Sequence, residues 1–372
     1  MSIGRSGAAA AQDALDELQQ LAESAGYVIG GTVQARRDKP DPALFVGAGK
    51  AEEIAARMKE AEAGVALFDV ALSPAQQRNL ERELACLVLD RTALILDIFG
   101  QRAKSREGKL QVELAQLDHL STRLVRGWTH LERQRGGLSK TGGPGEKQIE
   151  LDRRMITTRV KALRERLKVL HKQRRTQRRS RDRNRAFTVS LVGYTNAGKS
   201  TLFNTLTRAG TYAADQLFAT LDTTSRRCFV APDVEVVLSD TVGFIRGLPH
   251  ALVEAFKSTL EETVEADLLL HVVDAASPAR DAQMAEVDKV LHEIGADAVP
   301  RLIVFNKIDR IERAAGVEHD PCGTLSRVFL SAATGVGVDL LREVIADLAR
   351  AARDGEGRDA ELDPSVSADV SH

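Results

Sequence analysis

The sequence lacks the features that would place it in a membrane or outside the cell. None of the apolar runs in its 372 residues approaches the roughly 20 residues that a helix needs to cross a bilayer. Residues 1–12 are small and polar, without the charged segment and apolar core of a secretion signal. Only three cysteines occur, Cys86, Cys228 and Cys322, and they are scattered without metal-ligand spacing. Such a sparse, odd set is typical of a reducing cytosol, so we expect a cytoplasmic protein without membrane insertion.

The sequence also has almost no net charge, −1 in total, but the charge is distributed very unevenly. Residues 151–185 contain fifteen Lys or Arg and three Asp or Glu, a net charge of +12, and residues 101–150 carry a further +4. The rest of the chain carries −17. The basic segment is therefore suited to bind a polyanion. Nucleic acid is favoured over an anionic membrane, because no apolar face accompanies the arginines of residues 172–185.

The strongest motif is a phosphate loop of the pattern G-x-x-x-x-G-K-[ST]. Its residues are Gly193, Tyr194, Thr195, Asn196, Ala197, Gly198, Lys199 and Ser200. Residues 188–192 before it predict a buried strand, and Thr201 and the residues after it predict a helix. In this setting, successive backbone N–H groups and the helix dipole converge on phosphate. Lys199 is predicted to reach the β- and γ-phosphates, and the Ser200 hydroxyl to bind Mg²⁺.

Four further motifs follow in the order and approximate spacing of a GTPase. The first is a switch threonine, Thr220. The second is a magnesium motif, formed by Asp240, Thr241, Val242 and Gly243. The third is a guanine-specificity motif (Asn306, Lys307, Ile308 and Asp309), and the fourth is a guanine-support motif (Ser331, Ala332 and Ala333). Each of these short matches is weak alone, but four in order after a complete phosphate loop predict a GTPase with GTP or GDP as its ligand.

The chemistry of these motifs explains the residue types. Asp240 is predicted to hold Mg²⁺ through water, and the Gly243 N–H to sense the γ-phosphate. Thr220 is favoured over Thr223 or Thr224 as the ligand of Mg²⁺ and the γ-phosphate. The guanine-support motif offers backbone N–H groups to the guanine O6.

The guanine-specificity motif discriminates through its carboxylate. Asp309 can accept hydrogen bonds from the guanine N1–H and 2-amino group. Adenine has neither donor there, so a buried acceptor would be left unpaired and adenine would be rejected.

Two positions bear on hydrolysis. Many small GTPases orient the attacking water with a Gln directly after the glycine of the magnesium motif; here that residue is Phe244, which cannot hydrogen-bond to water. Asn196 resembles the asparagine that coordinates K⁺ in cation-activated GTPases. We predict that K⁺, held partly by Asn196, supplies the charge of an arginine finger; the alternative is that Asn196 only stabilises the loop's turn. The other residues predicted to act in catalysis are Lys199, Thr220 and Gly243.

Short apolar strands alternate with helices ahead of about residue 100, which predicts a small α/β domain with a largely parallel sheet. The expected strands are 27–33, 44–46, 65–70 and 87–90, and the expected helices are 13–25, 51–58 and 74–84. Residues 47–50 resemble part of a phosphate loop, but a tight turn is favoured over a second nucleotide site there.

Leucines at three-, four- and seven-residue steps predict an amphipathic helix over 107–124, and a second follows over about 147–175. Two such stripes predict an antiparallel helical hairpin. The glycine-rich stretch 126–146 between them cannot hold a helix. Its basic residues and the only tryptophan, Trp128, could contact RNA phosphates and stack on a base; alternatively, Trp128 packs at the hairpin end and the loop is a solvated linker.

The predicted fold class is therefore α/β, in a chain whose hydrophobic content of 43% suffices for real cores. We expect a small N-terminal α/β domain (1–105), a basic helical hairpin with a glycine-rich tip loop (106–185), a P-loop GTPase domain with a central mostly parallel sheet (186–350), and an acidic disordered tail (351–372).

Over about residues 42–348 the sequence resembles the HflX family of ribosome-associated GTPases. The resemblance lies in the stretches 72–81, 96–99, 107–117, 143–146 and 240–246. It implies binding to the large (50S) ribosomal subunit and its ribosomal RNA, with the hairpin loop entering the peptidyl-transferase region. It also implies splitting or rescue of stalled ribosomes, particularly under heat stress. The chain departs from the family at Lys147 and Thr223, where members usually have Thr and Pro.

Two other functions stay open. The chain could be a GTP-dependent regulatory switch whose hairpin docks on a protein partner, with hydrolysis as a timer. It could also be an ATP-assisted RNA remodeller that uses residues 47–50. We expect a monomer.

Overall fold

The computed structural model describes residues 8–35, 39–126, 144–182, 186–208, 217–218, 220–248, 250–319 and 325–361. The described residues form two compact units. The first unit comprises residues up to 176 together with 216–222 and 247–258, and the second comprises 177–215, 223–246 and the chain from 259 onward. In the part of the chain that the structure describes, no helix is long and apolar enough to cross a membrane.

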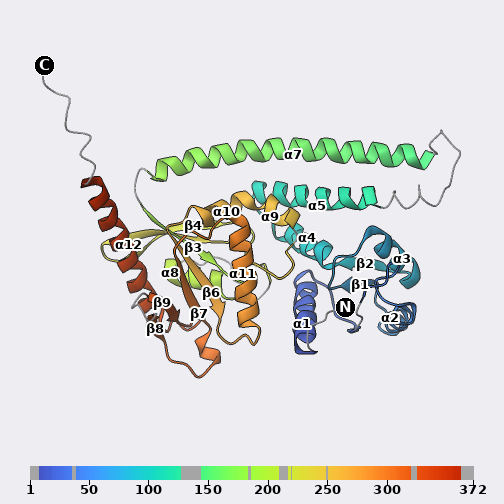
Figure 1. The fold of residues 1–372 in the computed structure, drawn as a ribbon, viewed down its shortest axis with the longest axis horizontal. Helices are drawn as coiled ribbons and strands as arrows, with labels where there is room; N and C mark the ends of the chain where they lie inside the picture. Colours follow the sequence, from blue (N-terminus) through green and yellow to red (C-terminus); the bar gives the residue numbers. More distant parts are fainter. Residues whose placement is uncertain are drawn as a thin grey trace, which may run out of the picture. The chain divides into compact units, whose positions relative to one another are not determined.

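The first unit begins with a small α/β layer (Figure 1). Its elements are α1 (Ala8–Ser24), α2 (Ala48–Glu60), β1 (Val65–Phe68), α3 (Pro74–Leu84), β2 (Leu87–Asp90) and α4 (Arg91–Arg102). Strands β1 and β2 pair in parallel, with Val65 opposite Leu87. The core between them and helices α2 and α3 includes the fully or nearly fully buried Phe68, Leu80 and Val88. The predicted α/β class is confirmed.

Two of the predicted strands are wrong, because residues 27–33 and 44–46 belong to no strand of either sheet in the described chain. Residues 27–33 contain a Gly30-Gly31 pair, which weakens a strand. Near 44–46, the Asp41 carboxylate accepts hydrogen bonds from the backbone N–H of Ala43 and Leu44, at 2.8 and 2.9 Å. This local turn takes up the donors that a strand would use.

Helix α4 has no counterpart among the elements expected from periodicity. Its buried residues are Arg91, Leu94, Ile95, Leu96, Ile98 and Phe99. All but Leu96 recur at three- and four-residue steps on one face, but the continuous apolar run of residues 93–96 is equally compatible with a strand.

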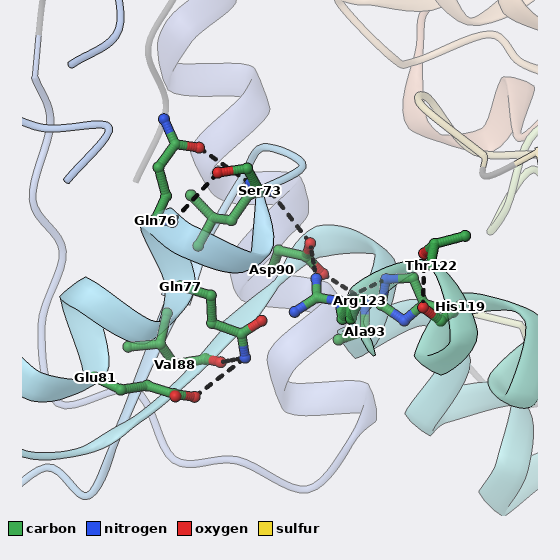
Figure 2. Close-up of polar contacts among 11 residues, drawn as sticks. Ser73, Gln76, Gln77, Glu81, Val88, Asp90, Ala93, His119, Thr122 and Arg123 are labelled. Atoms are coloured by element: carbon green, nitrogen blue, oxygen red, sulfur yellow. Dashed lines mark hydrogen bonds and ion pairs between the residues drawn. The ribbon is translucent and has the colours of Figure 1, made fainter. Parts of the chain in front are cut away.

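Side-chain caps define the starts of α3 and α4 (Figure 2). Ser73 and Gln76 form a reciprocal capping box ahead of α3, and Pro74 occupies its first turn. The Asp90 carboxylate accepts from the backbone N–H of Ala93 at 2.8 Å and so caps α4. The same carboxylate pairs with Arg123 of the next helix. One buried side chain therefore joins the end of the small sheet to the hairpin.

The two long helices are α5 (Arg106–Arg126) and α7 (Pro144–Asp182). Figure 1 shows them side by side and running in opposite directions. Leu114 of α5 packs in a cluster with Val160, Leu163 and Leu167 of α7, as the apolar stripes predict. Trp128 and the rest of the glycine-rich stretch up to residue 143 lie outside the described residues.

The second unit is built on a seven-stranded sheet of order β4-β5-β3-β6-β7-β9-β8. Its strands are β3 (Phe187–Val192), β4 (Thr224–Ala231), β5 (Val234–Asp240), β6 (Leu268–Asp274), β7 (Arg301–Asn306), β8 (Gly316–His319) and β9 (Leu325–Phe329). The five inner strands are parallel, and the edge strands β4 and β8 are antiparallel to their neighbours. The predicted mostly parallel sheet is confirmed.

Helices cover both faces of this sheet. They include α8 (Lys199–Thr207), α10 (Lys257–Val264), α11 (Arg280–Ile294), the 3₁₀ turn η1 (Ile308–Arg310) and α12 (Val338–Glu361), while the short α9 (His250–Ala255) belongs to the first unit. Leu202 of α8 and Leu341 of α12 share one buried core with Leu270 of β6. Met284 of α11 packs against Val273 in a second cluster. The strands that precede the predicted motifs are therefore packed into these two cores.

The predicted disordered tail begins too early. Helix α12 continues to Glu361, so residues 351–361 are helical. Ala349, Ala351 and Ala352 lie at this point, and alanine is the strongest helix former. Residues 362–372 lie outside the described part of the chain.

Candidate nucleotide site

Both glycines of the phosphate loop are required by the backbone. Gly193 has φ +146°, and a Cβ there would overlap the carbonyl oxygen of Val272 on β6. Gly198 has φ +93°, and a Cβ there would overlap the side-chain amide of Asn306. Asn196 also has a positive φ, +59°, which asparagine tolerates better than most residues. The loop therefore passes close to β6 and β7 before α8 begins at Lys199.

Lys199 is held inside the loop. Its Nζ donates hydrogen bonds to the carbonyl oxygens of Gly193 and Tyr194, at 3.0 and 2.8 Å. The pKa of Lys199 is lowered to about 8, mainly by burial; Asp240 opposes this shift and the nearby Lys307 adds to it. A buried ammonium group with a lowered pKa is suited to gain an anionic partner such as phosphate.

A hydroxyl and a carboxylate meet beside this lysine. The Ser200 hydroxyl donates to the Asp240 Oδ2 at 2.7 Å, at the carboxyl end of β5. The hydroxyl of Thr241 donates to the Leu191 carbonyl at 2.6 Å, which holds the ends of β5 and β3 together. Oxygen donors of this kind suit Mg²⁺. No group of three or more His, Cys, Asp or Glu side chains in the described ranges could hold a metal ion.

The residues after Asp240 lie against the phosphate loop. Phe244 donates its N–H to the Gly193 carbonyl at 3.1 Å, and its own carbonyl accepts from the Thr195 N–H at 2.7 Å. The Tyr194 hydroxyl accepts from the backbone N–H of Arg246 at 2.8 Å. Gly243 leaves so little room that a Cβ would lie 2.9 Å from the Thr195 Cα. The Phe244 ring is 0% exposed. At the position where many GTPases carry Gln, this chain therefore has a buried phenyl ring that cannot hydrogen-bond to the attacking water.

Asn306 joins the phosphate loop to the guanine motifs. Its Nδ2 donates to the Ala197 carbonyl, and its Oδ1 accepts from the Ala332 N–H, each at 2.9 Å. Lys307 has φ +64° and donates its Nζ to the Asp274 Oδ2 at 2.8 Å. The described contacts therefore bind the loop, the end of β7 and the residues after β9 into one framework.

The guanine motifs lie at the carboxyl ends of β7 and β9. Asp309 lies exposed on η1, Ser331 and Ala332 are buried, and Ala333 is exposed. All of the predicted site residues except Thr220 belong to the second unit; Thr220 belongs to the first.

Asp274 was not among the predicted site residues. It ends β6 at the same carboxyl edge as Asp240 ends β5. The sequence signal that could have identified Asp274 is a carboxylate directly after a largely apolar stretch. Ligands of open α/β sheets bind at the carboxyl edge where such a residue lies.

A glycine loop between a strand and a helix, a buried loop lysine and a guanine motif after a neighbouring strand define the class of P-loop GTPases. Three family models match the chain: "GTP-binding GTPase N-terminal" over residues 12–100, "GTP-binding GTPase Middle Region" over 102–181 and "50S ribosome-binding GTPase" over 188–307.

The chain is 55% identical over 334 residues to GTPase HflX of Escherichia coli strain K12, covering 90% of this chain and 78% of the relative. It is 50% identical over 343 residues to GTPase HflX of Magnetococcus marinus, covering 92% and 79%. The chain belongs to the HflX family of GTPases, and it binds and hydrolyses GTP.

The fold is similar to a solved structure described as the complex of SsGBP and GDP. The TM-score is 0.51 at 25% sequence identity, over 94% of this chain and 97% of that one. The predicted guanine nucleotide is therefore confirmed.

Proposed function

We propose that this GTPase binds the large (50S) ribosomal subunit through its basic hairpin and splits or rescues stalled ribosomes, particularly under heat stress. The exposed basic surface of α7 carries the proposal. Arg153, Lys161 and Arg166 are exposed and have no acidic partner among the described residues. A surface of this kind is suited to RNA phosphates. The match to a ribosome-binding GTPase model supports the same partner.

In the nucleotide site, we assign the phosphates to Lys199 and the backbone N–H groups of residues 193–201. The Ser200 hydroxyl and Thr220 would hold Mg²⁺ directly, and Asp240 through water. When bound, Mg²⁺ neutralises negative charge on the β- and γ-phosphates. The 2.7 Å contact between Ser200 and Asp240 fits this assignment, because it brings two oxygen donors together.

We assign guanine recognition to Asp309 and to the backbone after β9. The exposed Asp309 carboxylate would accept from the guanine N1–H and 2-amino group, and Ser331, Ala332 and Ala333 would offer N–H groups to O6. Asn306 orients the residues after β9, since its amide oxygen accepts from the Ala332 N–H.

Phe244 cannot orient the attacking water, so hydrolysis needs stabilisation of the transition state from another group. We propose that K⁺, held partly by the exposed Asn196, stabilises the phosphate charge while Gly243 and Thr220 contact the γ-phosphate. Replacing K⁺ with Na⁺ should slow turnover in the wild type, and Asn196→Ala should lose that dependence. Equal turnover in both salts, with and without ribosomes, would contradict the role of K⁺.

The ribosome proposal is tested by pelleting the full chain with purified large subunits in a non-hydrolysable GTP analogue. We expect binding that is weaker with GDP and lost when residues 126–147 are deleted. Addition of intact ribosomes with GTP should produce free subunits, measured by light scattering. Absence of pelleting at moderate salt, or binding untouched by the deletion, would contradict the proposal.

A protein partner for the hairpin is the second candidate. Leu151, Met155 and Val169 of α7 are 52%, 70% and 58% exposed, and exposed apolar side chains favour a protein contact. In this case the chain would be a GTP-dependent switch that does not pellet with ribosomal subunits. In either case we propose a cytoplasmic monomer.

A further inference from the structure

Two segments of the GTPase sequence pack with the first unit. Residues 216–222 follow α8 in the sequence, and residues 247–258 follow the magnesium motif, yet both belong to the same unit as α4 and α5. The described residues Leu217, Phe218 and 220–222 form the switch segment. It contains Thr220, the proposed ligand of Mg²⁺ and the γ-phosphate.

Apolar side chains anchor one end of the switch segment. Phe218 is 2% exposed, and its ring lies edge-on to Phe99 of α4 with centroids 4.6 Å apart. Phe99 also lies edge-on to Phe256, at 5.3 Å. Leu217 donates its N–H to the Ser24 hydroxyl at 3.3 Å. Edge-to-face ring pairs add to the free energy of burial, so this anchor is a packed contact.

A carboxylate anchors the other end. Asp222 accepts hydrogen bonds from the backbone N–H groups of Lys104 and Ser105, at 3.0 and 2.8 Å, and from the Ser105 hydroxyl. The Ser105 hydroxyl in turn accepts from the Gly108 N–H at 2.8 Å, which caps the first turn of α5. Asp222 therefore completes the cap at the start of a hairpin helix that is remote in sequence.

Gly108 makes room for this carboxylate. A Cβ at Gly108 would overlap the Asp222 Oδ1 and would lie 3.1 Å from the Ser105 Oγ. Glycine is otherwise a poor choice inside a helix. The first turn of α5 is thus shaped to receive Asp222.

The backbone of the docked segment is strained. Phe218 has φ +56°, a region that is unfavourable for a bulky side chain. Such conformations persist only where surrounding contacts hold them, and they are common in switch regions. The packing against Phe99 holds the strained residue in place.

We propose that the switch segment is a latch between the nucleotide and the hairpin. In the GDP form, Phe218 and Asp222 hold the segment on α4 and α5. Thr220 lies between the two anchors in the sequence, so its contact with the γ-phosphate and the docking of the segment on α4 and α5 are linked. In the triphosphate form Asp222 is released and α5 loses its cap, so Asp222 and Ser105 are positioning residues for Thr220.

The proposal rests on guanine nucleotide binding and on Thr220 as the phosphate ligand, and it needs no ribosome. Its test uses the full chain without ribosomes, so a failure of the latch and a failure of ribosome binding are distinguishable. Asp222→Ala removes the cap, and Gly108→Ala displaces the carboxylate without altering the switch segment. The exposed Asp281→Ala on α11 is the matched control.

The first readout is the ratio of the affinities for GMPPNP and GDP. Because binding and docking are linked, each latch variant should raise this ratio about fivefold, and the double variant should raise it no further. Gly108→Ala should raise the ratio because it displaces Asp222. Loss of helix propensity cannot be the cause, since alanine is a better helix former than glycine. Asp281→Ala should leave the ratio unchanged.

The second readout is hydrogen exchange at residues 104–109. In the wild type, these amides should exchange faster with GMPPNP than with GDP; in Asp222→Ala they should exchange equally fast with both. The conservative Asp222→Asn, which keeps one acceptor, should give an intermediate result. Equal protection with both nucleotides in the wild type, or an unchanged affinity ratio in folded Asp222→Ala and Gly108→Ala, would overturn the latch.

Discussion

His271 and Lys199 are buried ionisable residues on neighbouring parts of the second unit. His271 lies in the interior strand β6, is 1% exposed, and its Nδ1 has no hydrogen-bond partner in the described structure. The pKa of His271 is lowered to about 4, mainly by burial; Arg301 and Lys199 add to this shift, whereas Asp288 opposes it. The folded protein therefore resists protonation of this ring far more strongly than the unfolded chain does.

We predict that His271 makes the second unit acid-sensitive. Between about pH 6.5 and pH 4 the unfolded chain binds more protons at this position, so stability increases with pH through this window and is lost as pH falls. Its contribution at pH 5 should be about 2 kcal/mol lower than at pH 7.5. Denaturant unfolding of His271→Leu should show this part of the pH dependence removed. The exposed His319→Gln should retain it; an unchanged slope in His271→Leu would contradict the prediction.

Lys199 should make nucleotide binding sensitive to alkaline pH. Its pKa of about 8 means that the free site loses its positive charge above that pH, whereas a bound phosphate would keep the lysine protonated. Affinity for GDP should therefore fall about fourfold from pH 7 to pH 8.5, as measured by titration calorimetry. Lys199→Arg binds more weakly overall but stays charged, so its pH profile should be flat. A flat wild-type profile would argue against a lowered pKa.

At the scale of elements, the hairpin depends on the packing between α5 and α7. Leu163 is 0% exposed and packs in the cluster that includes Leu114 and Val160. On the same helix, Val169 is 58% exposed. The two positions therefore compare a buried and an exposed apolar residue within one helix.

Leu163→Ala should destabilise the first unit by about 2–5 kcal/mol, because it leaves a cavity between the two helices. Hydrogen exchange along α5 should become faster, and thermal unfolding should begin at a lower temperature. Val169→Ala should change stability by about 0.5 kcal/mol or less. Similar effects of the two substitutions would show that the helices are not held by this cluster.

At the scale of the whole molecule, the separation of charge predicts how binding depends on salt. The +12 of residues 151–185 contrasts with the net negative charge of the sequence outside 101–185. Polyanion binding by such a segment releases counterions, so affinity falls as salt rises. This dependence distinguishes an RNA contact from an apolar protein contact.

Replacing Arg153, Lys161 and Arg166 with Gln should weaken binding to large subunits and flatten its salt dependence. The slope of log affinity against log salt should fall by about 2 if these side chains contact phosphates. Arg350→Gln on α12, which breaks an exposed pair with Asp233, is the control and should leave the slope unchanged. An unaltered slope in the triple variant would favour the protein-partner function.

The parts of the fold that were predicted best are those with strong local patterns. The strand 188–192 lies within β3, and the predicted helix 74–84 coincides with α3, whose Ser73 cap and Pro74 are start signals. Helix α4 and the unpaired residues 27–33 were predicted poorly. The continuous apolar run of residues 93–96 is as compatible with a strand as with a helix, and a strand requires a partner that sequence alone does not supply.

The sequence by itself determined the phosphate loop, the guanine motif and the family. Their chemistry depends on local residue types: glycines at Gly193 and Gly198, the cation of Lys199 and the carboxylate of Asp309. The tertiary structure alone decided that Asp222 caps α5 and that Phe218 packs on Phe99. Those contacts join residues more than a hundred positions apart, and no local propensity specifies which distant elements pack together.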